Sequence, residues 1–147
     1  MKAITIRQPY ADAIVQPSPL PKRIENRGWP LPPRYIGVPV LLHSAATTYP
    51  AVGRLAIHDI TGHDPDEQWP GVRGAILARI TFTGCHFDGD AECDEQCATW
   101  GFEQVFHWRI ADVTALPAPV PAKGALSFWT PAPGVLTAVQ QQLGVPA

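Results

Sequence analysis

The sequence predicts an α+β domain in which short strands form a small mixed barrel or sheet, flanked by short helices. Proline accounts for 17 of the 147 residues, and each proline removes a backbone donor, which disfavours long helices and wide central strands. Strand patterns dominate and show no alternating βαβ rhythm. The 46% hydrophobic composition is enough to build a core. We therefore expect one domain over residues 1–147 and neither a helix bundle nor a coiled coil.

The first half of the chain contains two strand patterns and two helical patterns. Strands are expected over residues 3–7 and 35–43, and helices over residues 10–15 and 48–60. The second strand is a nearly continuous apolar run, which indicates burial on both faces. Pro39 interrupts this run and indicates an edge strand or a bulge.

The second half begins with the strongest strand pattern of the sequence, at residues 74–83. An acidic loop with glycine and cysteine is expected over residues 84–103, and an insert of this length in a small domain is more often functional or mobile than packed. A further strand should span residues 105–116 and end at the prolines that follow it. An edge strand over 124–129 and a terminal helix over about 133–143 complete the predicted elements.

Charge is unevenly distributed, although the net charge is only −2. Residues 1–54 contain seven Lys/Arg against two acidic residues, which gives +5, whereas residues 55–100 contain two against nine, which gives −7. This polarity predicts a basic face with a local site for an anionic partner. The alternative is that the acidic stretch is a solvated loop.

The sequence shows no feature of a membrane or secreted protein. No apolar run reaches the length of a membrane span, and residues 1–7 contain no stretch long enough for a signal peptide. Three cysteines are too few, and odd in number, for a disulfide framework. We expect a cytoplasmic monomer that does not contact membranes.

The most polar hexapeptide of the chain, residues 22–27, is the first candidate site. In an extended segment, Arg23, Glu25 and Arg27 project to one side, whereas Lys22, Ile24 and Asn26 project to the other. Glu25 could accept a hydrogen bond from an exocyclic amine while an arginine binds a phosphate. The alternative is a salt-bridged edge strand.

Two further candidates lie at strand ends. Arg7, Gln8 and Tyr10 stand at a strand-to-helix junction, where free backbone N–H groups can bind an anion. His43 and Ser44 end the second strand, but neighbouring strand residues face opposite ways and do not make a catalytic pair. Because no nucleophile elbow is present either, the sequence argues against a serine hydrolase.

Aromatic residues offer stacking surfaces for a base. Trp29 follows the charged hexapeptide, so it could stack on a base that Glu25 or Asn26 reads. We expect Trp108 and Trp129 to belong to the core.

Three cysteines and a histidine lie close together in the sequence: Cys85, His86, Cys93 and Cys97. Four such ligands would suit structural zinc, but their order matches none of the usual paired knuckles. Free thiols or a local disulfide are the alternatives, and whether these residues bind zinc is left open. We assign no metal site and no cofactor.

Several ordered motifs together resemble ASCH (activating signal cointegrator homology) domains of the PUA-like superfamily. The opening from Ala3 to Tyr10 reads Ala-Ile-Thr-Ile-Arg-Gln-Pro-Tyr, and the family motif G-x-K-x-x-E-x-R is matched by Lys22, Glu25 and Arg27. Leu20 stands where the glycine is expected. Later strands are similar at residues 43–45, 74–77, 107–108 and 124–129, so the resemblance covers about residues 1–130.

The resemblance implies a PUA-like mixed β-barrel with a cleft lined by the Lys-x-x-Glu-x-Arg strand. Relatives are regarded as nucleic-acid binding, in many cases RNA binding. A subset resembles amidohydrolases acting on N4-acetylcytidine, and some members are regarded as ribonucleases. In the amidohydrolase subset the motif lysine works with a threonine three residues later, a position that Glu25 occupies here.

We therefore expect a nucleic-acid or nucleotide-binding module, for RNA, a modified nucleoside or nucleotide, or single-stranded DNA. The binding residues would be Arg7, Gln8, Tyr10, Lys22, Glu25, Asn26, Arg27, Trp29, His43 and Ser44. If the protein is an enzyme, Lys22 and Glu25 would be catalytic. A rival hypothesis is a protein-interaction module whose apolar, proline-rich surface binds a partner helix.

Overall fold

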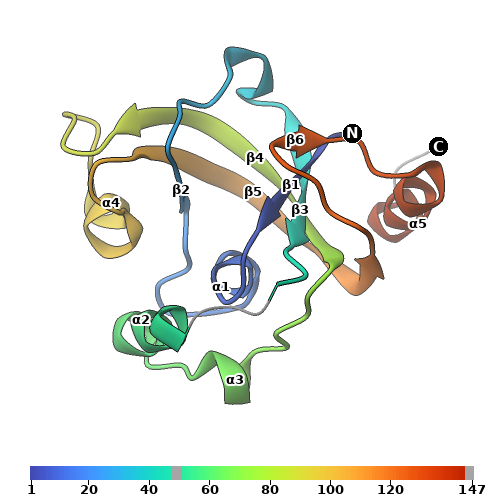
Figure 1. The fold of residues 1–147 in the computed structure, drawn as a ribbon, viewed down its shortest axis with the longest axis horizontal. Coiled ribbons are helices and arrows are strands. Elements are labelled where there is room, and N and C mark those ends of the chain that lie inside the picture. The colour runs from blue at the N-terminus through green and yellow to red at the C-terminus, as the bar shows by residue number, and fades with distance from the viewer. Residues whose placement is uncertain (48–50, 145–147) are drawn as a thin grey trace.

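The computed structural model describes residues 1–47 and 51–144, which form an α+β fold around one mixed sheet (Figure 1). The order of its six strands is β2-β5-β4-β3-β1-β6. Their bounds are β1 Ala3–Ile6, β2 Ile24–Arg27, β3 Pro39–Ser44, β4 Ala75–Phe87, β5 Phe106–Pro121 and β6 Phe128–Trp129. The helices are α1 Tyr10–Val15, α2 Ala51–Thr61, α3 Pro65–Gln68, α4 Glu95–Trp100 and α5 Pro133–Leu143, with a 3-10 turn at Pro33–Tyr35.

The two longest strands, β4 and β5, pair antiparallel and form the longest ladder of the sheet. Strand β2 pairs antiparallel with the beginning of β5, and β3 pairs antiparallel with β4. The single parallel pair in the described sheet joins β1 to β3. This arrangement agrees with the predicted α+β class.

The predicted closed barrel is not confirmed. The sheet curls until β2 lies across from β1, but no described ladder joins these strands (Figure 1). Strand β2 has only four residues, and a side chain makes the contact instead: Arg27 Nη2 donates to Thr5 O over 2.9 Å. The sheet is therefore open, because β2 and β1 are not paired with each other.

Apolar side chains fill both faces of the sheet, as the continuous apolar run in β3 predicts. Val40 and Leu42 belong to the cluster that includes Phe82, Trp108 and Ile14 of α1. Leu41 lies in the opposite cluster, which α5 covers through Val139 (Figure 1).

Strand β3 differs from the prediction in its start and its place. It begins at Pro39, since residues 33–35 form a 3-10 turn and Gly37 adopts a positive φ of 73°. It pairs on both sides, so it is not the edge strand that Pro39 suggested. The first residue of a strand is a position that tolerates proline.

The prediction of a loop over residues 84–103 is wrong for much of this segment. Strand β4 continues to Phe87 because its end pairs with the beginning of β5. Helix α4 then forms over Glu95–Trp100, where the Asp94 side chain accepts hydrogen bonds from the N–H groups of Gln96 and Cys97. An N-cap of this kind satisfies donors that the first helical turn leaves free.

Strand β5 passes the prolines that were expected to end it at residue 116. Ala78 of β4 pairs with Ala115, whereas Ile76 pairs with Val120, so β5 contains a bulge between these positions. Pro117 and Pro119 lie in this bulge, where a missing N–H breaks no regular ladder.

The other predicted elements are confirmed within a few residues: β1, α1, β6 and α5. Helix α2 begins at Ala51 in the structure, and the predicted residues 48–50 lie outside the described ones. No helix in residues 1–47 and 51–144 combines the length and apolar character needed to cross a membrane.

Phe82→Ala should destabilise the fold strongly. The Phe82 side chain is fully buried and packs edge-to-face on Trp108, with ring centroids 5.3 Å apart. Removing it should lower the free energy of unfolding by about 3–5 kcal/mol, because a cavity replaces the ring. Urea unfolding followed by tryptophan fluorescence measures the loss.

The matched control is Phe87→Ala on the same strand, where the ring is 41% exposed. It should cost about 1 kcal/mol or less. Equal losses for the two variants would contradict the assigned core.

Candidate functional site

A cavity of about 830 Å³ opens between the edge strand β2 and β1, which are not paired with each other. Its described lining combines β1, β2, the beginning of α1, part of α2 and the segment before β6. The residues are Thr5, Ile6, Arg7, Tyr10, Lys22, Glu25, Asn26, Arg27, Ala45, Thr47, Val52, Ala56, Phe102, Ala125, Leu126 and Ser127. This volume lies within the range of ~300–1,000 Å³ that is usual for small-ligand sites.

Three charged side chains form an ion-paired triad in this cavity. Glu25 Oε2 lies 3.4 Å from Lys22 Nζ, and Glu25 Oε1 lies 3.1 Å from Arg27 Nε. The carboxylate therefore bridges two cations instead of pairing with one of them. Lys22 also donates to Ile24 O, which fixes the ammonium against the backbone of β2.

Lys22 is almost fully buried, with 1% of its surface exposed. Burial lowers the pKa of Lys22, and the charge and hydrogen bond of Glu25 oppose this effect. Arg27 adds a smaller lowering through like-charge repulsion. A buried amine near a carboxylate can either bind a ligand as a cation or accept a proton as a base.

Arg27 joins the triad to β1. Its donation to Thr5 O fixes the distance between β2 and β1 at one point. The hydroxyl of Thr5 lies 3.1 Å from His43 Nδ1 and accepts from Trp129 Nε1 at 3.1 Å. The position of Arg27 therefore depends on a network that reaches β3 and β6.

Aromatic and apolar groups form the remaining walls. Tyr10 and Phe102 meet edge-to-face with ring centroids 6.0 Å apart, and Lys22 Nζ lies 5.7 Å from the Tyr10 ring centre. Burial raises the pKa of Tyr10, as does the charge of Glu25. Leu126 and Val52 are exposed at the rim. The cavity thus combines the charged triad with aromatic and apolar walls.

Asn26 positions the wall that contains Phe102. Its Nδ2 donates to Trp100 O over 3.0 Å, and its Oδ1 accepts from Phe102 N over 2.8 Å. Both polar ends of the amide are therefore used by the backbone that leaves α4. We infer that Asn26 acts on the cavity chiefly through this wall.

Six of the predicted binding residues line the cavity together: Arg7, Tyr10, Lys22, Glu25, Asn26 and Arg27. The prediction that Lys22 and Glu25 project to opposite sides of an extended hexapeptide is wrong. Lys22 precedes β2, and its side chain reaches Glu25. Arg23 projects elsewhere and donates to Ile14 O and Lys22 O.

The other four predicted residues are not among the lining. Gln8 is buried and donates to Val72 O, and Ser44 is buried and donates to Ala75 O. Trp29 is half exposed, and its carbonyl accepts from Trp108 Nε1. Ser44 and Gln8 therefore support local packing.

His43 serves to hold the segment that covers the cavity. Its Nε2 lies 2.8 Å from Ala122 O, and a Cβ on Gly124 would come within 2.6 Å of its ring. Gly124 is thus needed for this close approach. Burial lowers the pKa of His43, partly offset by the bond to Ala122.

Phe102 and Ser127 were not predicted as site residues, although both line the cavity. Phe102 fell in a segment expected to be a loop, and no periodicity marked it. Ser127 has a positive φ of 57°, which bends the chain before β6 toward the cavity. Only folding brings these residues to β2.

The described lining contains one carboxylate and neither an imidazole nor a thiol, so it is not a donor set for a transition metal. The chain matches no protein-family model and no curated protein sequence.

Lys22→Met should change how stability depends on pH. Because the folded pKa of Lys22 lies below its ordinary value of 10.5, the unfolded chain holds a proton between these two values that the folded chain has lost. The stability of the native protein should therefore rise with pH across this window, relative to Lys22→Met, by at most about 1.4 kcal/mol per pH unit.

Urea unfolding of both proteins, from neutral pH up to 10.5, measures this difference. A difference that stays constant, or falls, would contradict the lowered pKa.

Proposed function

We propose that this chain is an ASCH-type, PUA-like domain that binds RNA or a modified nucleoside or nucleotide. The base would enter the cavity between β1 and β2, and the Lys22–Glu25–Arg27 triad would contact it. The observation that most supports this proposal is that this buried triad lies beside two aromatic side chains in one cavity.

The chemistry of the lining suits a nucleobase better than an aliphatic ligand. Glu25 can accept hydrogen bonds from an exocyclic amine, and Lys22 and Arg27 can donate to ring or carbonyl acceptors. Tyr10 and Phe102 offer aromatic surface on which a splayed-out base can stack, as single-stranded RNA recognition requires.

Charge supports a ligand with few phosphates. The described lining contains three cations, Arg7, Lys22 and Arg27, against the single carboxylate of Glu25. Arg7 is exposed and can meet a phosphate at the rim, whereas the buried Lys22 and the partly buried Arg27 are already shared with Glu25. Arg54, a further cation of the basic N-terminal part, is paired with Asp64 and Asp66.

Short RNA and single-stranded DNA oligonucleotides should bind weakly and with a shallow salt dependence. One phosphate contact, at Arg7, predicts a slope of about −0.7 for log K against log salt. Arg7→Ala should lower the affinity and reduce the slope by about 0.7. Phe102→Ala should lower the binding free energy by about 1–3 kcal/mol, because a stacking surface is lost. Fluorescence anisotropy at two salt concentrations measures these effects.

Matched controls are Arg34→Ala and Phe87→Ala, which change exposed residues of the same types outside the lining. They should bind as the native protein does. The proposal fails if nothing binds at ~50 mM salt. It also fails if folded Lys22→Ala and Arg27→Ala variants bind normally, in which case a protein-interaction module becomes the better hypothesis.

A second candidate function is hydrolysis of an N4-acylated cytidine, and the buried Lys22 amine favours it. With its pKa lowered, a neutral Lys22 could take a proton from water, whose oxygen then attacks the acyl carbon. The bond from the acyl carbon to N4 breaks, and the proton passes to the departing amine. The products are cytidine and a carboxylic acid.

If this hydrolysis occurs, N4-acetylcytidine should be converted to cytidine by the native protein and not by Lys22→Ala. Chromatography of an N4-acylated cytidine panel, with Arg34→Ala as the control, measures turnover. The same incubation with an RNA oligonucleotide tests the ribonuclease alternative. Absence of product at high enzyme concentration, together with normal binding, would exclude catalysis and leave a binding module.

A further inference from the structure

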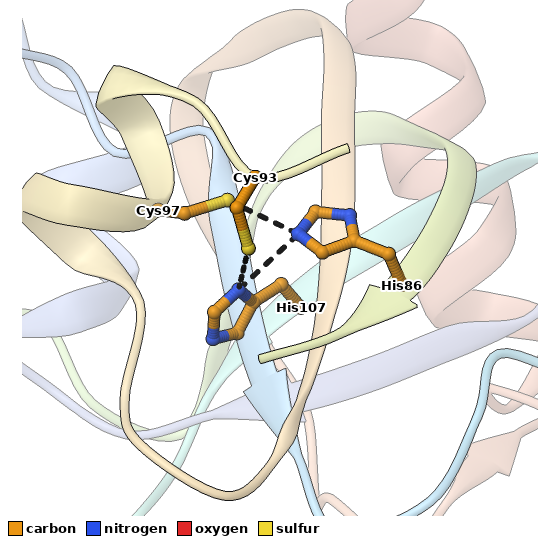
Figure 2. Close-up of side chains that lie close together, drawn as sticks. All are labelled: His86, Cys93, Cys97 and His107. Atoms are coloured by element: carbon orange, nitrogen blue, oxygen red, sulfur yellow. Dashed lines mark hydrogen bonds between the residues drawn. The ribbon is translucent and has the colours of Figure 1, made fainter. Parts of the chain in front are cut away.

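Four side chains of types that can ligate a metal meet near Phe102, outside the lining of the cavity. They are His86 of β4, Cys93 before α4, Cys97 of α4 and His107 of β5, and Figure 2 shows them pointing toward one another. One ligand atom from each lies within 4.8 Å of the other three. His107 lies 21 residues after His86, and the pairing of these two residues across β4 and β5 brings them together.

The distances match the edges of a small tetrahedron. Bond lengths of about 2.05 Å to nitrogen and 2.3 Å to sulfur imply edges of about 3.3 Å between nitrogens and about 3.6 Å between nitrogen and sulfur. His86 Nε2 lies 3.3 Å from His107 Nδ1 and 3.1 Å from Cys97 Sγ. Cys93 Sγ lies 4.0 Å from His107 Nδ1. These three distances lie within about 0.5 Å of the tetrahedral edges, and all six ligand pairs lie within 4.8 Å.

The surroundings of His107 present the correct nitrogen to this centre. His107 Nε2 lies 2.8 Å from Phe102 O, and a carbonyl can only accept, so Nε2 carries the proton. In the neutral ring, Nδ1 then directs its lone pair at the other three ligands. Such a bond from the distal nitrogen to a carbonyl is usual for histidines that bind zinc.

Burial and close packing separate this cluster from a chance meeting of surface groups. His86, Cys97 and His107 are all buried. A Cβ on Gly101 would come within 2.6 Å of the His107 ring, so only glycine allows the chain to pass there. Cys85, which adjoins His86 in the sequence, accepts from Leu31 N instead and lies outside the cluster.

We propose that His86, Cys93, Cys97 and His107 form a structural zinc site. Two thiolates and two imidazoles are a common set for a closed tetrahedral site, with no position left for substrate. This proposal replaces the sequence-based assignment of no metal site. It also differs from the four residues considered from the sequence, because His107 takes the place of Cys85.

The site would fix α4 and the chain after it to the sheet. Cys93 and Cys97 flank the beginning of α4, whereas both histidines belong to the paired strands. His107 also holds Phe102 through its carbonyl, and Phe102 lines the cavity. Zinc would thus stabilise one wall of the proposed binding site, although the zinc proposal does not depend on that function.

The full-length protein, produced in medium supplemented with zinc, should contain one zinc per chain by elemental analysis. Cobalt replacing the zinc should give the visible bands of a tetrahedral site and a thiolate charge-transfer band. Removing the metal with a chelator should lower the unfolding temperature, and returning zinc should restore it.

Cys93→Ser and Cys97→Ser should each lower the cobalt affinity at least tenfold, whereas Cys85→Ser should bind cobalt as the native protein does. Because Cys93 is the less buried ligand, its variant is expected to fold even if Cys97→Ser does not. The proposal is overturned if the folded native protein binds neither metal, if it contains a Cys93–Cys97 disulfide under reducing purification, or if Cys85→Ser loses binding as the other variants do.

Discussion

The buried carboxylate of Glu25 is the constraint on which the candidate site depends. It lies between Lys22 and Arg27, and each of these cations would be costly to bury without it. Arg27, held in this way, reaches Thr5 O on β1. One carboxylate therefore keeps a lysine inside the protein, orients an arginine and spaces two strands. Replacing Glu25 would disturb all three features together.

The open edge of the sheet explains why a cavity exists at all. A ladder between β1 and β2 would satisfy their backbone groups but would bring the strands to ~4.8 Å and leave no room for a ligand. Instead, the Arg27 side chain spans from β2 to β1. Residues of these two strands line the cavity, and α1 and the segment before β6 supply further walls.

Helix α4 and the chain after it link the two proposed sites. Asn26 binds the backbone at Trp100 and Phe102, and His107 binds the same segment at Phe102 O. The cavity wall is therefore held from β2 on one side and from β5 on the other. A zinc ion at His107 would make the second attachment stiffer, which is useful for an aromatic wall that must present a fixed face to a base.

The sequence by itself determined the α+β class, the strands β3 and β4 to within a few residues, and the terminal helix, because periodicity and proline placement are local properties. It also identified Lys22, Glu25 and Arg27, since such a dense polar hexapeptide is conspicuous in a chain with few charges. It could not place Phe102 at the cavity or His107 beside Cys93 and Cys97, because strand register and sheet curl decide those contacts. The bulge that lets β5 continue past its prolines, and the missing ladder between β1 and β2, likewise depend on pairing between distant segments. Only the tertiary structure decided these features, because they result from contacts between residues that are far apart in the sequence.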